Sequence, residues 1–177
     1  IGAQVSMQAV AHYVTPYEMA TRLLIGASSI GSAAYPEFVR LSAGDTAASA
    51  RRRHFLRTSA LALLAAFVPA AFVFAFAHPI LSAWISPSFA DESHQILRVL
   101  LVGVAINGAS YIPFALVQGS GRADMTAKLH LLELCLYVPA LLALLSTFGA
   151  LGAAFAWVAR VTLDAALLFG YALRSLR

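Results

Sequence analysis

The 177-residue chain is too apolar for an ordinary soluble domain, since 60% of its residues are hydrophobic and 11% are charged, against roughly a quarter charged in soluble proteins. Its mean hydropathy of +0.79 indicates a chain built for a lipid bilayer. The net charge is +4, and the single cysteine, Cys135, excludes an internal disulfide.

Long runs without charge mark the expected membrane spans, because a helix needs about 20 mostly apolar residues to cross the hydrocarbon core. The clearest runs begin at Thr58 and Val99, and a third begins at Leu134. Glycines at Gly149 and Gly152 interrupt the third run and predict a turn between two helices. We expect an all-α, polytopic bundle of five spanning helices, at about residues 12–39, 58–78, 97–119, 128–147 and 151–173. The first of these is the least uniformly apolar.

The basic residues predict how these helices are oriented. Nine of the twelve lie in alternate connections: Arg40, Arg51, Arg52, Arg53, Arg57, Arg122, Lys128, Arg174 and Arg177. By the positive-inside rule these connections are cytoplasmic, so the amino end of the chain lies outside and the carboxyl end inside. The RRRHFLR cluster directly precedes a span, and contact with membrane lipid headgroups explains it better than nucleic-acid binding. We therefore expect a multi-pass protein with no nucleic-acid partner.

The start of the chain has neither an initiator Met nor a charged signal-peptide region. Five helices that begin outside the cell suggest the carboxyl-terminal part of a longer protein. We expect residues 1–177 to form one incomplete transmembrane unit.

Two pairs of opposite charges lie within the expected spans and are the candidate site residues. Glu18 and Arg22 are one helical turn apart in the first span, and Arg160 and Asp164 repeat this spacing in the fifth. Ionisable groups in a span cost about 2.5–3.5 kcal/mol on insertion scales and usually face a bundle interior or a wet cavity. For Glu18 and Arg22 we favour a cavity role; for the second pair, mutual neutralisation that permits insertion is an equally good explanation.

Other polar residues carry weaker signals. Asn107, near the middle of the third span, can bond a sugar hydroxyl or, more commonly, a neighbouring helix. Glu133, one turn or so into the fourth helix from the cytoplasm, is expected to pair with Lys128 or His130 at the interface, which is more often snorkelling than chemistry. Pro113 is expected to bend the third helix.

Nothing in the sequence predicts catalysis or a cofactor. The histidines His12, His54, His78, His94 and His130 have no metal-ligand spacing, and one cysteine supports no zinc site. A Gly-rich phosphate loop and an assembled Ser/His/Asp set are also lacking. We expect a protein that is not an enzyme, with no catalytic residue, metal site or cofactor.

Four stretches resemble the carboxyl half of bacterial polysaccharide flippases of the Wzx type, in the multidrug/oligosaccharidyl-lipid/polysaccharide exporter superfamily: AVAHYVTPYEMATRLL, AAYPEFVRL, LRVLLVGVAINGASYIPFALVQGSGRADMTAKLHLLEL and GALGAAFAWVARVTLDAALLF. The most specific parts are YVTPYEMATRL, QGSGRADMTAKLHLLEL and GAAFAWVARVTLDA. The resemblance covers nearly the whole chain and keeps the order of segments.

The resemblance implies a carrier of two pseudo-symmetric six-helix lobes in the bacterial cytoplasmic membrane. Such a carrier moves an undecaprenyl-diphosphate-linked oligosaccharide to the outer leaflet through a cationic cavity. The matching cavity positions are Glu18 and Arg22, with Arg160 and Asp164 as further candidates. The chain lacks the first lobe and the first helix of the second, so we expect the amino-terminal lobe as its partner.

Two alternatives remain open at this stage. A cation-coupled multidrug antiporter of the same superfamily would use Glu18 or Asp164 as its proton or sodium site. A membrane assembly subunit without transport activity fits if five helices are the native protein.

Overall fold

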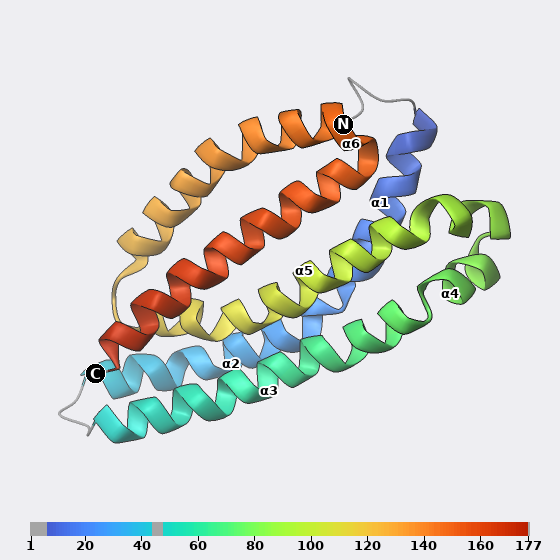
Figure 1. Ribbon diagram of the computed structural model, residues 1–177. Helices are drawn as coiled ribbons and strands as arrows, with labels where there is room; N and C mark the ends of the chain where they lie inside the picture. The colour runs from blue at the N-terminus through green and yellow to red at the C-terminus, as the bar shows by residue number, and fades with distance from the viewer. Residues whose placement is uncertain (1–6, 44–47, 177) are drawn as a thin grey trace.

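The computed structural model describes residues 7–43 and 48–176. Within these residues there are six helices and no strand: α1 (Met7–Arg22), α2 (Leu24–Ala43), α3 (Ala48–Ala75), α4 (Ala77–Trp84), α5 (Pro87–Gly119) and α6 (Ala123–Ser175). The long helices run side by side (Figure 1). This arrangement confirms the expected all-α fold.

Three of the six helices are long and apolar enough to cross a membrane, namely α3, α5 and α6. The region expected as the first span, 12–39, is divided between α1 and α2, and neither helix meets the same criterion alone. The count of five spanning helices therefore stays a prediction.

The division between α1 and α2 falls at Leu23. Its backbone N–H donates to the carbonyl of Ala20, three residues back, at 3.1 Å, so one turn is tighter than the α-helical pattern. The turn comes directly after the Glu18–Arg22 pair and sets the direction in which α2 continues.

A proline lies just after the break between α3 and α4. Pro79 lacks a backbone N–H, and its ring would clash with the carbonyl of Ala75, four residues earlier. Helix α3 ends at Ala75 and α4 begins at Ala77, whereas Pro69 lies inside α3 without ending it. The expected second span, 58–78, therefore lies over the end of α3 and the start of α4.

Helix α6 is a hairpin of two antiparallel arms, which Figure 1 shows in orange and red. The backbone leaves helical geometry at Gly149, with φ 58° and ψ −140°, a conformation that only glycine adopts readily. A side chain at Gly152 would overlap the carbonyl of Leu144. The turn lies between the expected ranges 128–147 and 151–173. We call residues 123–148 the amino arm and residues 150–175 the carboxyl arm.

Helix α5 lies at the centre of the bundle and contacts each of the other five helices. Its buried residues are divided between two apolar clusters, one toward each end of the helix. Small residues permit close approach: a Cβ on Gly108 would overlap Ala66 on α3, and one on Gly103 would overlap the Trp157 ring on α6. Such contacts are typical of helix packing in membranes.

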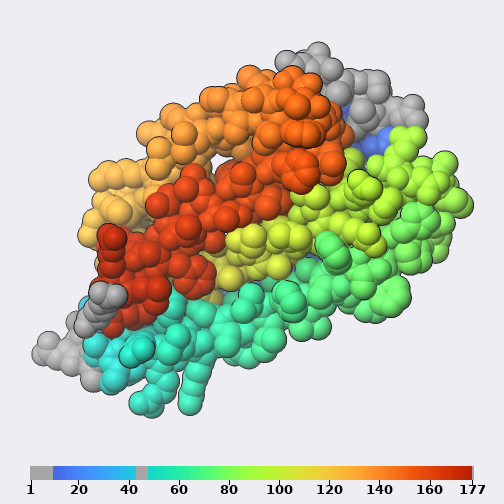
Figure 2. All heavy atoms as spheres, viewed as in Figure 1, coloured from blue at the N-terminus to red at the C-terminus, as the bar shows by residue number. Residues whose placement is uncertain are grey.

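The outward face of α3 is apolar. Phe67, Val68 and Phe72 are each more than half exposed, and this helix forms the lower flank of the molecule in Figure 2. In a bilayer this face would contact acyl chains.

The contact between Gly108 and Ala66 gives a stability prediction. Gly108→Ala should lower the free energy of unfolding by about 1–3 kcal/mol, because the added methyl must separate α3 from α5. Denaturant unfolding in detergent micelles measures this. Gly170→Ala is the matched control, since no atom lies within 4 Å of a Cβ there. An equal effect of the two substitutions would contradict the proposed packing role.

Candidate functional site

Glu18 and Arg22 lie on one face of α1 and form an ion pair, with 3.8 Å between Arg22 Nη2 and Glu18 Oε2. Both side chains are exposed, Glu18 by 63% and Arg22 by 73%. The pair is held by its i, i+4 spacing alone, so Arg22 can exchange Glu18 for another anion at little cost.

Arg160, on the carboxyl arm of α6, forms its ion pair with Glu133 on the amino arm. Arg160 Nε lies 3.1 Å from Glu133 Oε2, and the Glu133 side chain is only 1% exposed. The spacing of residues 160 and 164 suggested a pair within one helix, but the hairpin brings a second acid to Arg160 from the facing arm. Glu133 is buried between the arms rather than snorkelling to an interface.

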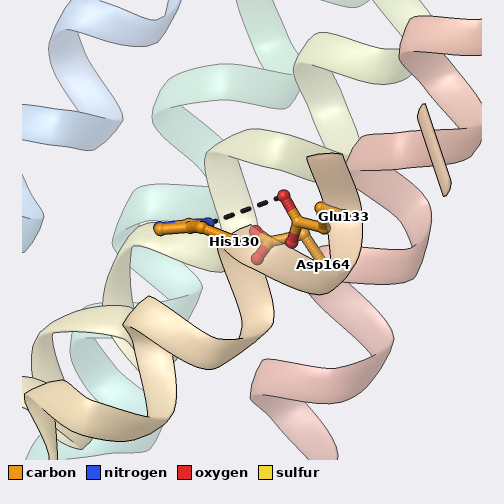
Figure 3. Close-up of side chains that lie close together, drawn as sticks. All are labelled: His130, Glu133 and Asp164. Atoms are coloured by element: carbon orange, nitrogen blue, oxygen red, sulfur yellow. Dashed lines mark ion pairs between the residues drawn. The ribbon is translucent and has the colours of Figure 1, made fainter. Parts of the chain in front are cut away.

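Asp164 and His130 lie beside this ion pair. One ligand atom each from His130, Glu133 and Asp164 all lie within 4.8 Å of one another, and Figure 3 shows the two carboxylates converging next to the imidazole. His130 Nδ1 is 3.5 Å from Glu133 Oε2. Among the described residues, Glu133 Oε1 and Asp164 Oδ1 are buried without a hydrogen-bond partner. We call His130, Glu133, Asp164 and Arg160 the charged cluster.

The charged cluster has the chemistry to hold a small cation. It places two carboxylates near one guanidinium, so with neutral His130 a single additional positive charge would balance it. Sequence spacing alone did not predict this group, because Glu133 and Asp164 come from different arms. The one sequence feature that could have indicated this group is Glu133, an isolated acidic residue in the apolar run LHLLELCLY.

Lys128, the other expected neighbour of Glu133, pairs elsewhere. Its Nζ lies 3.4 Å from Asp124 Oδ2, and Arg122 Nε lies 3.1 Å from Asp124 Oδ1. The hydrogen bond from Arg122 lowers the pKa of Asp124 from its ordinary value. This exposed network at the start of α6 is separate from the charged cluster.

A polar cavity of about 350 Å³ opens between α1, α2, α5 and α6, and Asn107, Tyr111 and Arg160 line it. The same three residues also line an adjoining cavity of about 160 Å³, which Asp164 and His130 complete. A third, of about 110 Å³, lies between the arms of α6 at Glu133 and Arg160. Figure 2 shows a gap between these two arms. Arg160 therefore connects all three spaces.

The candidate residues thus fall into two groups. Asn107, Arg160 and Asp164 come together around these cavities. Glu18 and Arg22 do not line them, but Tyr17 and Thr21, on the same helix, line the larger one. The exposed pair on α1 is therefore at the margin of the space that Arg160 enters.

A serine, a histidine and a glutamate also meet where α1 crosses α5. His12 Nδ1 lies 2.7 Å from Ser93 Oγ, and His12 Nε2 lies 3.1 Å from Glu92 Oε2. Ser93 is fully buried, so its hydroxyl is closed to any substrate. The group joins α1 to α5, as the contact of His78 Nε2 with Asp91 Oδ1 at 2.8 Å joins α4 to α5.

The two ion pairs should differ in their contribution to stability. In a double-mutant cycle with Arg160→Met and Glu133→Gln, we expect a coupling energy of about 0.5–3 kcal/mol, because Glu133 is buried. The control cycle, Glu18→Gln with Arg22→Gln, should give less than about 0.5 kcal/mol, because both groups are solvated. Unfolding free energies in micelles supply both values. Equal coupling in the two cycles would contradict the structural assignment.

Comparison with known proteins gives one informative relative. The chain is 33% identical over 160 residues to a Shigella flexneri protein named "Putative O-antigen transporter". The match covers 90% of this chain but only 37% of the relative. No protein-family model and no solved structure matches the chain. The sequence predicted a resemblance to bacterial polysaccharide exporters. The comparison confirms that the chain is related in sequence to a protein named as a putative O-antigen transporter.

Proposed function

We propose that this chain takes part in moving undecaprenyl-diphosphate-linked oligosaccharide across the bacterial cytoplasmic membrane for polysaccharide synthesis. The observation that carries the proposal is the cavity in which Asn107, Tyr111 and Arg160 meet. A polar surface is costly against hydrocarbon, whereas the outward face of α3 is apolar. The cavity is therefore suited to water and a polar ligand.

Arg160 supplies the chemistry that a diphosphate requires. Its side chain is 39% exposed, and a guanidinium can donate two parallel hydrogen bonds to a phosphate. When the cavity is empty, Glu133 holds the guanidinium in place, so the site carries no isolated buried cation. When an anionic headgroup arrives, it can compete with Glu133 for the same donors.

Arg22 is the second proposed headgroup contact. It is solvated, it lies at the margin of the cavity, and its partner Glu18 holds it only weakly. In this proposal Arg22 first attracts the diphosphate, and Arg160 then binds it deeper in the cavity.

The complete transport route requires more protein than this chain. The chain spans 37% of the length of the Shigella flexneri relative, and its polar cavity is not enclosed. We infer that an amino-terminal lobe covers the cavity and that alternating access arises as the two lobes rock against each other. The lipid tail would remain among membrane lipids. The amino end of the chain would lie outside and the carboxyl end in the cytoplasm.

The charged cluster is the proposed site of coupling to a proton or sodium gradient. Glu133 and Asp164 each have a buried oxygen without a partner in the described residues, so a bound cation would supply the missing interaction. The same observation favours a second candidate function, a cation-coupled multidrug antiporter. Such a protein would respond to the gradient without any sugar lipid.

Arg22→Ala and Arg160→Ala in the full-length gene product should each lower glycolipid export about tenfold or more, because a charged contact to the headgroup is lost. The measurement is cell-surface polysaccharide at matched protein abundance. Arg22→Lys and Arg160→Lys should recover part of the export, since lysine keeps the positive charge but lacks the planar group that donates two parallel hydrogen bonds. Normal export by both alanine variants at normal abundance would leave these arginines only a structural role.

Glu133→Gln and Asp164→Asn should make transport insensitive to the ion gradient, because neither amide can carry the charge that binds the cation. Flipping in vesicles with imposed proton or sodium gradients measures this dependence. Glu37→Gln is the matched control, since Glu37 pairs with Arg40 outside the cavity. Undiminished gradient dependence in both cluster variants would move the coupling site elsewhere. Gradient-driven drug efflux without glycolipid transport would favour the antiporter.

A further inference from the structure

A second compartment, with a few polar groups in a mostly apolar lining, adjoins the cavity that Arg160 enters. It has a volume of about 360 Å³ and lies between α2 and α5, lined by Ser28, Gly31, Ser32, Tyr35, Tyr111, Phe114, Ala115 and Gln118. None of these lining residues carries a charge. We call this space the aromatic compartment. Its composition differs from that of the charged cluster, so it is suited to a different part of a ligand.

The side chains of the aromatic compartment match the two kinds of surface on a sugar ring. Tyr35, Tyr111 and Phe114 offer flat apolar faces, which can pack against the C–H face of a pyranose. Ser28, Ser32 and Gln118 offer hydroxyl and amide groups, which can donate to and accept from sugar hydroxyls. A few polar groups placed among aromatic rings are typical of small-molecule sites.

The groove between α3 and α5 provides a comparison within the same molecule. It has a similar volume, about 340 Å³, but its lining is entirely apolar: Phe67, Ala70, Ala71, Phe74, Leu101, Val102, Ala105 and Ile106. That composition suits acyl chains. Ser28 Oγ donates to the carbonyl of Ile25 and Gln118 Nε2 donates to Thr126 Oγ1. Ser28 Oγ and Gln118 Oε1 can still accept hydrogen bonds, which a sugar hydroxyl can donate and a lipid tail cannot.

The aromatic compartment is next to the cavity that contains Arg160 and shares lining residues with it. Ser28 and Tyr111 line both spaces, and Phe114 and Tyr111 also line the smaller cavity beside Asp164. Gly31 brings the α2 backbone close to α5, since a Cβ there would lie 3.0 Å from Tyr111 Cβ. A ligand whose diphosphate meets Arg160 would therefore place its next group beside Tyr111.

We propose that the aromatic compartment between α2 and α5 is a subsite for an uncharged sugar directly attached to the diphosphate. This inference rests on the proposed function, because the sugar belongs to the same glycolipid whose diphosphate Arg160 would bind. The compartment would thus select on the sugar, whereas Arg160 and Arg22 would bind the headgroup that every substrate shares.

The experiment compares two lipids in vesicles of phosphatidylethanolamine and phosphatidylglycerol that contain the full-length gene product. One lipid is undecaprenyl diphosphate, and the other is the same lipid bearing a single uncharged N-acetylhexosamine. Tyr35→Ala should slow flipping of the sugar-bearing lipid about three- to tenfold, the value of one aromatic contact, and leave the sugar-free lipid unchanged. Tyr35 is 42% exposed, so its removal should not unfold the protein.

Gln118→Ala is the second variant and should show the same selectivity through a lost hydrogen bond. Phe72→Ala is the matched control, because Phe72 is an exposed aromatic residue on the outward face of α3, and it should slow neither lipid. Equal slowing of both lipids by Tyr35→Ala and Gln118→Ala, or of neither, would overturn the sugar subsite while the proposed function stood. Failure of the unaltered protein to move either lipid would overturn both.

Discussion

Burial of Glu133 constrains the whole carboxyl half of the molecule. A carboxylate that is 1% exposed needs a cation, and Arg160, 3.1 Å away on the facing arm of α6, is its ion-pair partner. The pair fixes the arms of the hairpin relative to each other, since removing Arg160 would leave the Glu133 carboxylate buried and uncompensated. The turn at Gly149 makes this pairing possible. Structure and proposed chemistry thus depend on one contact.

The same guanidinium serves two environments. On one side it meets Glu133, with Asp164 and His130 beside it; on the other it lines the cavity with Asn107 and Tyr111. Binding of a ligand on one side of Arg160 can therefore change the affinity for a ligand on the other side. If an anion draws Arg160 away, Glu133 gains affinity for a cation, and by linkage the cation favours the anion equally. This reciprocity connects the two parts of the proposed transport cycle.

Close packing around α5 positions the cavity. Trp157 fits against Gly103 and also lines the polar space near Arg160. Gly31 likewise lies near Tyr111. Tyr111 lines the aromatic compartment and both cavities that contain Asn107. Small residues therefore do more than join helices, because they determine which aromatic rings face the cavity.

The sequence by itself determined what depends on local spacing and on composition. Apolar runs predicted an all-α membrane bundle, the glycines near residue 149 predicted the turn in α6, and the i, i+4 spacing of Glu18 and Arg22 predicted their ion pair. Each of these is decided within one or two helical turns.

Only the tertiary structure decided which distant residues meet. Arg160 pairs with Glu133, 27 positions away, because the hairpin turns those faces of its arms toward each other, and no periodicity within one helix encodes that choice. The same holds for His130 beside Asp164 and for the aromatic compartment between α2 and α5. These contacts arise from the packing of helices around α5, where side-chain size sets which faces approach.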